Sequence, residues 1–208
     1  MPTQRLLPRI QEDILELQDD LRSALLLGFR VVQIDEMMVT RRTFPTHDWA
    51  KLRSNTSLDL GQMNTAATAV IGAISREMGV ELMMQFPKSV NVMRFKIFLE
   101  ELRRKYPYDN MILVMDNLAV HRSQHTVERM NELGFRYAWT PRYSPQYNGI
   151  EEVWSMSKRY IKEERLNRIL RGEKMNMHEL ISESFDRISI LSIAKCINRS
   201  IQLLNLNL

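Results

Sequence analysis

An unbroken run of five apolar residues, Met111 to Met115, most constrains the fold of this 208-residue chain. Apolar side chains without polar alternation indicate a strand that is buried on both faces. A strand of this kind belongs to a sheet that is covered by helices on both sides. The run ends abruptly at Asp116, so a carboxylate is expected at one edge of that sheet.

Strands and helices are predicted on both sides of this run from the spacing of apolar residues. Ahead of it, helical spacing from Ile10 to Leu25 predicts a helix that stops at Gly28. Strands are predicted at 29–35, 37–44, 66–74 and 79–86, with 45–64 as a long connection and a further helix at 92–102. The first of these strands also ends on a carboxylate, Asp35.

The second half of the chain continues as strand, helix, strand and helix. A short helix is predicted at 127–133, a strand at 135–139, a helix at 150–161 and one or two closing helices from 179 onward. A three-strand meander followed by alternating helices and strands predicts an α/β protein with a mixed sheet. This order of strands and helices fits a ribonuclease-H-like fold. We divide the chain into an N-terminal linker or oligomerisation helix (1–28), a catalytic domain (29–165) and a C-terminal helical extension that packs on it (166–208).

The composition narrows the choice of compartment and partner. The 29 Lys and Arg residues against 25 Asp and Glu give a formal charge of +4, which is compatible with a polyanionic partner but does not require one. The single cysteine, Cys196, excludes an internal disulfide and a cysteine-rich zinc site, and we expect it to be a buried thiol in an intracellular protein. No stretch resembles a membrane span or a secretory signal.

Three acidic residues occupy positions suited to one metal site: Asp35 and Asp116 end two apolar strands, and Glu151 opens a predicted helix. Carboxylates without His or Cys partners are hard ligands, which suit magnesium or manganese. Two such ions, about 3.5–4 Å apart, activate a water or a 3′-hydroxyl on one side of a phosphodiester and stabilise the leaving oxygen on the other. In this hypothesis Asp35 bridges both ions, and each of the other two acids completes the shell of one.

Each acid also has a structural interpretation. Asp favours turns, and Glu in the first turn of a helix complements the helix dipole. Taken one at a time, the carboxylates are better explained in this way. The residues around them decide between the two interpretations.

Three segments of the sequence carry a family resemblance. They are Ile34-Asp35-Glu36, then Met115-Asp116-Asn117 with His121, and finally Tyr143-Ser144-Pro145 with Asn148, Ile150, Glu151, Trp154 and Lys158. Together they resemble mariner-like transposases of the DDE superfamily and related bacterial insertion-sequence enzymes. The family separates its second and third acids by about 34 residues, and here 151 − 116 − 1 leaves 34. The resemblance runs from about Phe29 to Lys162.

The resemblance implies DNA cleavage and strand transfer by Asp35, Asp116 and Glu151, with two magnesium ions for which manganese can substitute. It further implies DNA as partner, in the form of transposon ends and target, and a homodimer or higher homo-oligomer. Relatives carry an N-terminal helix-turn-helix domain, which we do not find before Phe29 and which a separate chain or a removed segment would have to supply. The expected location is the nucleus in a eukaryote and the cytoplasm or nucleoid in a bacterium.

Further residues are candidates for supporting the carboxylates or for contacting DNA. They are Asn117, His121, Arg142, Asn148, Lys158 and Lys162. Lys158 and Lys162 follow Glu151 by seven and eleven residues, close to the same helical face, so they are the preferred DNA contacts. For His121 and Asn117 a structural role in the loop or turn remains open, and most basic residues are ordinary solvated charges.

Several neighbours are assigned to other roles. Glu152 lies about 100° round the helix from Glu151, and Glu36 points to the opposite face of its strand from Asp35, so both are expected to be surface or salt-bridge acids. Trp154 belongs to the apolar stripe of the core. Gly149 replaces the proline that the family usually has, and we expect it to loosen the start of the helix.

Three functions remain open on the sequence alone. The first is an active transposase or a domesticated descendant that cuts DNA and joins 3′-hydroxyls. The second is a catalytically silent relative that keeps the fold for binding DNA or protein. The third is a different metal nuclease on the same fold, since fold alone does not fix function.

Overall fold

The computed structural model describes residues 7–40 and 67–206, which form a five-stranded mixed sheet. The strands are β1 (Arg30–Val39), β2 (Thr68–Ser75), β3 (Gly79–Pro87), β4 (Met111–Met115) and β5 (Arg136–Trp139), in the order β3-β2-β1-β4-β5. The first three pair antiparallel as a meander, and β4 joins β1 and β5 by parallel pairing. The predicted mixed sheet is confirmed.

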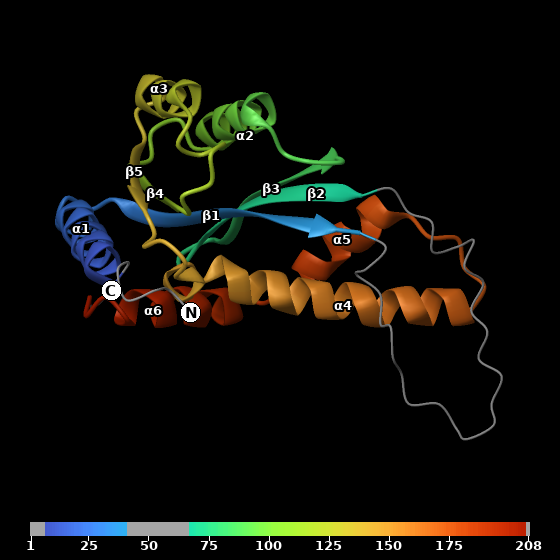
Figure 1. Cartoon of the computed structure of the whole chain (residues 1–208). Helices are drawn as coiled ribbons and strands as arrows, with labels where there is room; N and C mark the ends of the chain where they lie inside the picture. The colour runs from blue at the N-terminus through green and yellow to red at the C-terminus, as the bar shows by residue number, and fades with distance from the viewer. Residues whose placement is uncertain (1–6, 41–66, 207–208) are drawn as a thin grey trace.

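Helices cover both faces of this sheet (Figure 1). The α-helices are α1 (Leu7–Leu26), α2 (Val92–Lys105), α3 (Gln124–Glu132), α4 (Ile150–Leu170), α5 (Met177–Asp186) and α6 (Ile190–Gln202), and a short 3-10 turn η3 (Pro145–Tyr147) precedes α4. Figure 1 shows α2 and α3 on one side of the strands and α4, α5 and α6 on the other. The C-terminal region therefore contains two helices, α5 and α6, where the sequence predicted one or two.

The alternation of side chains along β1 divides the core into two parts. Val31, Met37 and Val39 belong to the cluster that includes α1, α4, α5 and α6. Val32 and Ile34 belong to the cluster under α2 and α3. Because neighbouring residues of a strand face opposite sides, Asp35 is turned toward α4 and Glu36 toward α2.

The apolar run from Met111 to Met115 forms β4, in which every residue is buried. Its side chains alternate between the two core clusters, so both of its faces are covered. The parallel partners on either side are β1 and β5. The prediction of a fully buried strand ending at Asp116 is confirmed.

The boundary between the first two predicted strands was wrong. The segment 37–39 continues β1, because Glu36 is not a turn residue and β1 pairs with β2 without interruption from Val32 to Val39. Asp35 therefore lies inside a strand and not at its end. The rest of the predicted strand, from 41 to 44, and the connection 45–64 lie outside the described residues.

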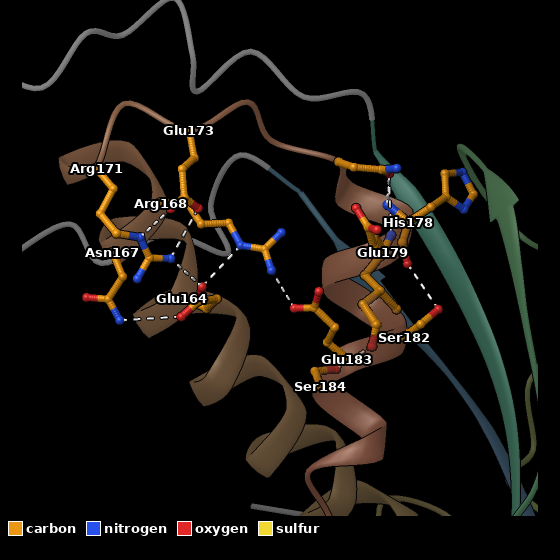
Figure 2. Close-up of polar contacts among 12 residues, drawn as sticks. Glu164, Asn167, Arg168, Arg171, Glu173, His178, Glu179, Ser182, Glu183 and Ser184 are labelled. Atoms are coloured by element: carbon orange, nitrogen blue, oxygen red, sulfur yellow. Dashed lines mark hydrogen bonds and ion pairs between the residues drawn. The ribbon is translucent and has the colours of Figure 1, made fainter.

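The helix predicted at 150–161 extends to Leu170, beyond the position where the sequence becomes polar and basic. Arg168 explains part of this extension, since its guanidinium pairs with Glu164 on the same helix at 3.1 Å and with Glu183 of α5 at 2.5 Å. Arg171 joins the same group through Glu164 at 2.9 Å. Figure 2 shows this network between the two helices. The distal half of α4 is thereby tied to α5.

Two smaller expectations concern the whole chain. Cys196 is a free, buried cysteine, as predicted. Among residues 7–40 and 67–206, no helix is both long and apolar enough to cross a membrane.

Phe98 offers a test of the packing beneath α2. Its side chain is completely buried, so Phe98→Ala should lower the free energy of unfolding by about 3–5 kcal/mol through lost burial and a residual cavity. The neighbouring Ile97 is 39% exposed, and Ile97→Ala should cost far less. Urea unfolding followed by circular dichroism measures both. Equal losses for the two variants would contradict the described packing.

Candidate active site

Asp35 and Asp116 lie where the parallel ladder between β1 and β4 ends. The last paired residues in that ladder are Gln33 and Val114, and each acid follows its paired residue by two positions. Both acids therefore lie at the edge of the sheet where the pairing of β1 with β4 ends. It is the β1–β4 pairing, and not β1 itself, that stops before Asp35.

Asp35 is buried on the face of the sheet that α4 covers. One of its carboxylate oxygens, Oδ2, accepts a hydrogen bond of 2.8 Å from the indole Nε1 of Trp154. Burial, followed by repulsion from Glu151, raises the pKa of Asp35 to about 7. The carboxylate is thus held in a position where its negative charge lacks a full counter-charge.

Gly72 makes room for the indole that contacts Asp35. It lies opposite Asp35 in the β1–β2 ladder, and a Cβ at this position would come within 2.5 Å of Cη2 of Trp154. The indole therefore lies directly against the backbone of β2. Trp154 is buried, as predicted, but it serves the site as well as the core.

Asp116 is fixed by two hydrogen bonds to Oδ1. The backbone N–H of Leu118 donates at 3.0 Å, and Nδ1 of His121 donates at 2.8 Å. Burial works to raise the pKa of Asp116, but these hydrogen bonds outweigh it and the pKa is lowered. Asp116 is therefore held in the charged form.

His121 joins Asp116 to Glu36 through the interior of the protein. Its ring has no exposed surface, and its Nε2 lies 2.9 Å from Oε1 of Glu36. Burial tends to lower the pKa of the ring, but the hydrogen bonds to the two carboxylates raise it to about 10. His121 is therefore a buried imidazolium that donates from both nitrogens, and Glu36 is its salt-bridge partner.

Asn148 and Gly149 attach the start of α4 to β1. Asn148 is buried, donates from Nδ2 to the carbonyl of Ile34 at 3.3 Å and accepts from the backbone N–H of Ile150. The N–H of Gly149 donates to Oε1 of Gln33 at 2.8 Å. The first turn of α4 is thus bonded to the two residues that precede Asp35.

Glu151 follows this attachment as the second residue of α4. Partial burial raises its pKa; Lys158 opposes the shift, and repulsion from Asp116 adds to it. The three predicted acids are therefore electrostatically coupled, because Glu151 acts on Asp35 and Asp116 acts on Glu151. Glu152 instead pairs with Arg199 of α6 at 2.6 Å, as expected for a salt-bridge acid.

The glycine at position 149 has a function that the sequence analysis did not anticipate. A Cβ here would lie 2.7 Å from the backbone carbonyl of Cys196 and 2.9 Å from the nitrogen of Ile197. The residue is therefore needed for close contact between the start of α4 and α6. A proline would also lose the N–H that bonds Gln33, so our expectation that glycine loosens the helix start is wrong.

Asp116 and Glu151 line an open cleft of about 510 Å³. Its other polar walls include Asn117, Arg122, Arg142 and Asn148. Asp35 does not line this cleft and lies behind it. The cleft therefore exposes two of the three acids to solvent.

The remaining sequence candidates are spread around the cleft. Asn117 donates a hydrogen bond of 2.6 Å to the carbonyl of Thr140 and accepts one from Arg122. These hydrogen bonds hold the loop after β4 and do not involve Asp116. Arg142 is exposed at the rim, 3.7 Å from Asp13 of α1. Lys158 acts electrostatically on Glu151, and Lys162 is exposed further along α4.

Two residues of the site were missed by the sequence analysis, Gln33 and Gly72. Gln33 is 1% exposed and spans from Gly149 to Ser200 of α6, to which its Nε2 donates at 2.9 Å. A glutamine in an otherwise apolar strand could have been noticed as a buried polar group that needs partners. Gly72 gave no signal, since its requirement appears only when Trp154 lies against it.

The carboxylates of this site suit a divalent cation whose coordination shell is completed by the substrate. Within 7–40 and 67–206, no three His, Cys, Asp or Glu side chains form a group that could hold a metal ion by themselves. Magnesium commonly takes one or two carboxylates together with waters and substrate phosphates. The buried Asp35, with its raised pKa and anionic neighbours, is consistent with such a partly built site.

Comparison with known proteins identifies the family and the fold of the chain. The family model described as DDE superfamily endonuclease matches residues 30–171, which is most of the chain and includes all three acids. The class that the fold defines is ribonuclease-H-like, with a mixed sheet flanked by helices. The chain belongs to the DDE superfamily endonucleases. No curated protein sequence matches it.

Several of the solved structures similar to this chain are of the Mos1 transposase. A Mos1 transposase paired-end complex with the left transposon end has a TM-score of 0.75 at 16% identity, covering 99% of this chain and 62% of that one. The crystal structure of the Mos1 catalytic domain gives 0.65 at 15% identity, covering 99% and 93%. The chain therefore has the fold of that catalytic domain and spans about 62% of the transposase chain in the paired-end complex.

His121 provides a test of the interior charge network. Replacing it in His121→Ala leaves Glu36 and Asp116 without their shared cation, and we expect a loss of about 3 kcal/mol in unfolding free energy. His125 is a matched control, since it is 76% exposed and lies 3.7 Å from Glu128. His125→Ala should change stability by less than about 0.5 kcal/mol in the same urea titration. Similar values for both histidines would rule out the network.

Gly149 provides a test of the contact between α4 and α6. Gly149→Ala should destabilise the protein by about 1–3 kcal/mol, because its methyl group meets backbone atoms that cannot turn aside. Gln146→Ala, at an exposed position in the preceding turn, serves as the control and should be close to neutral. Thermal unfolding of both variants measures the difference. A neutral Gly149→Ala would show that the helices are further apart than described.

Proposed function

We propose that this chain is the catalytic domain of a mariner-like transposase that cleaves DNA phosphodiester bonds and joins 3′-hydroxyl ends to target DNA. The proposed ligands of the divalent cations are Asp35, Asp116 and Glu151, with magnesium as the cation and manganese as a substitute. The family match supports the nuclease part of this proposal. Strand transfer goes further and rests on the fold similarity.

The observation that carries the proposal is that three acids from three separate elements act electrostatically on one another. Asp35 comes from β1, Asp116 follows β4, and Glu151 lies at the start of α4. Burial raises the pKa of both Asp35 and Glu151, and repulsion from Glu151 and from Asp116, respectively, adds to these shifts. Anionic groups that repel one another in this way favour a nearby cation.

Each residue of the site would have its own role in phosphodiester cleavage. When bound, divalent cations would polarise the scissile phosphate and assist attack by water or a 3′-hydroxyl. Asp116 and Glu151 face the open cleft and would meet the substrate phosphate, while Asp35 holds the inner position. Trp154 and His121 would fix the orientations of Asp35 and Asp116, because each donates a hydrogen bond to one carboxylate.

Substrate and partner are proposed from the structural relatives. Mos1 structures are described with a left transposon end, as a strand transfer complex, and with manganese or magnesium. By analogy we propose transposon-end and target DNA as substrates and pairing of two chains. Arg142 at the rim of the cleft and exposed Lys162 further along α4 are proposed DNA contacts.

Substitution of the acids tests this function. Asp116→Asn and Glu151→Gln should each lower magnesium- or manganese-dependent nicking of a supercoiled plasmid at least about 100-fold, because each removes one ligand charge. Glu152→Gln is the matched control, since that acid pairs with Arg199 on α6, and it should keep most of the activity. Calorimetric titration with manganese provides a second readout, in which the two active-site variants should bind more weakly than the control.

The outcomes separate the proposed functions. Equal nicking by wild type and both active-site variants would overturn the assignment of the acids. DNA binding without cleavage by the wild type, in either metal, would favour the catalytically silent relative. Nicking without strand transfer of an added 3′-hydroxyl oligonucleotide would favour a nuclease of the same fold.

A further inference from the structure

A groove with an excess of positive charge runs between α4 and α6, next to the candidate active site. Its wall on α4 includes Ser155 and Arg159, and its wall on α6 includes Ser192, Lys195 and Arg199. It continues past Arg159 into a second hollow that Arg187 and Glu163 line. We call this continuous feature the α4–α6 groove.

The charges in the groove are unbalanced. Four cationic side chains and two acidic ones line it, which leaves two positive charges in excess. Arg199 is paired with Glu152, and Arg187 lies over the ring of Tyr160. Among the described residues, neither Arg159 nor Lys195 forms an ion pair, and both are exposed. Two cations from two different helices thus face a common hollow without a carboxylate partner in the described part of the chain.

The distal end of α4 shows the opposite situation. There Arg168 and Arg171 also line a polar hollow, but each is paired with glutamates of α4, α5 or the following turn. Figure 2 shows these guanidinium groups held in that network. Such paired charges stabilise the packing of helices and leave little attraction for an external anion. The comparison distinguishes the α4–α6 groove from ordinary helix-to-helix ion pairing.

The groove starts next to Glu151, one of the two acids that line the cleft. Glu152, which lines it, is the residue after Glu151, and Arg159 follows Glu152 by seven positions on the same stripe of α4. Lys158 lies seven positions after Glu151 on the neighbouring stripe. A polyanion that extends from the cleft along α4 would therefore pass Lys158 and Arg159.

We infer that the α4–α6 groove binds the phosphodiester backbone of DNA that flanks the cleavage position, with Arg159 and Lys195 as the main contacts. This inference rests on the proposed function, because it takes the substrate to be DNA. Cationic side chains recognise phosphates without regard to base sequence, and the hydroxyl groups of Ser155 and Ser192 add hydrogen-bonding capacity. The groove therefore positions DNA and does not select a sequence.

Salt-dependent binding tests the inference. The full chain is mixed in EDTA, which prevents cleavage, with a fluorescein-labelled 30-base-pair duplex of arbitrary sequence, and anisotropy is followed between 50 and 200 mM salt. The double variant Arg159→Gln/Lys195→Gln should bind about tenfold more weakly at low salt. The slope of log affinity against log salt should fall by about 1.8, as expected for two lost phosphate contacts. A single-stranded oligonucleotide of the same sequence shows which form of DNA the groove prefers.

A matched control removes the same charge from the other face of the sheet. Lys96→Gln/Arg104→Gln lies on α2, opposite α4 and α6 (Figure 1), and should leave the salt slope near that of the wild type. The conservative pair Arg159→Lys/Lys195→Arg should retain binding, which separates a loss of charge from a loss of folding. Weakening by the groove variant no greater than by the control would overturn the inference. Failure of the proposed function would appear separately, as absence of nicking in magnesium with the salt effect intact.

Discussion

The attachment of α4 to β1 is the contact on which the candidate site depends. Asn148 bonds the carbonyl of Ile34, and Gly149 bonds the buried Gln33, so the first turn of α4 is fixed to the two residues before Asp35. Gly149 also lets α6 approach closely, and Gln33 bonds Ser200 on that helix. Together with the core packing of Ile150, Val153 and Trp154, these bonds fix the position of Glu151 relative to the sheet.

The two faces of the sheet hold the acids by different means. Under α4, Trp154 donates to Asp35 from an indole that lies against Gly72, and the pKa of Asp35 remains raised. Under α2, the buried imidazolium of His121 neutralises much of the charge on Asp116 and Glu36. The site therefore contains one acid with a built-in counter-ion and one without. Asp35 therefore lacks a balancing positive charge, and an added cation would be most stabilising there.

Local pattern predicted much of the fold, whereas the choice of the three acids came from the family resemblance and stays a prediction. The apolar run at Met111–Met115 marked the central strand because burial on both faces leaves its signature in consecutive residues. The break after Asp35 was mispredicted, since strand length depends on pairing with β2, which is remote in sequence. Gly72, Gln33 and the need for glycine at 149 depend on contacts between distant elements, and no local spacing encodes such contacts.

The central claim is that Asp35, Asp116 and Glu151 together bind divalent cations. Crystals of the chain soaked in manganese, with anomalous diffraction data collected above and below the manganese absorption edge, test it most directly. The account predicts an anomalous peak within coordination distance of Asp35 and at least one of the other two acids, at about 2.0–2.2 Å from the ligand oxygens. A peak that contacts none of the three, or no peak at saturating manganese, would contradict it.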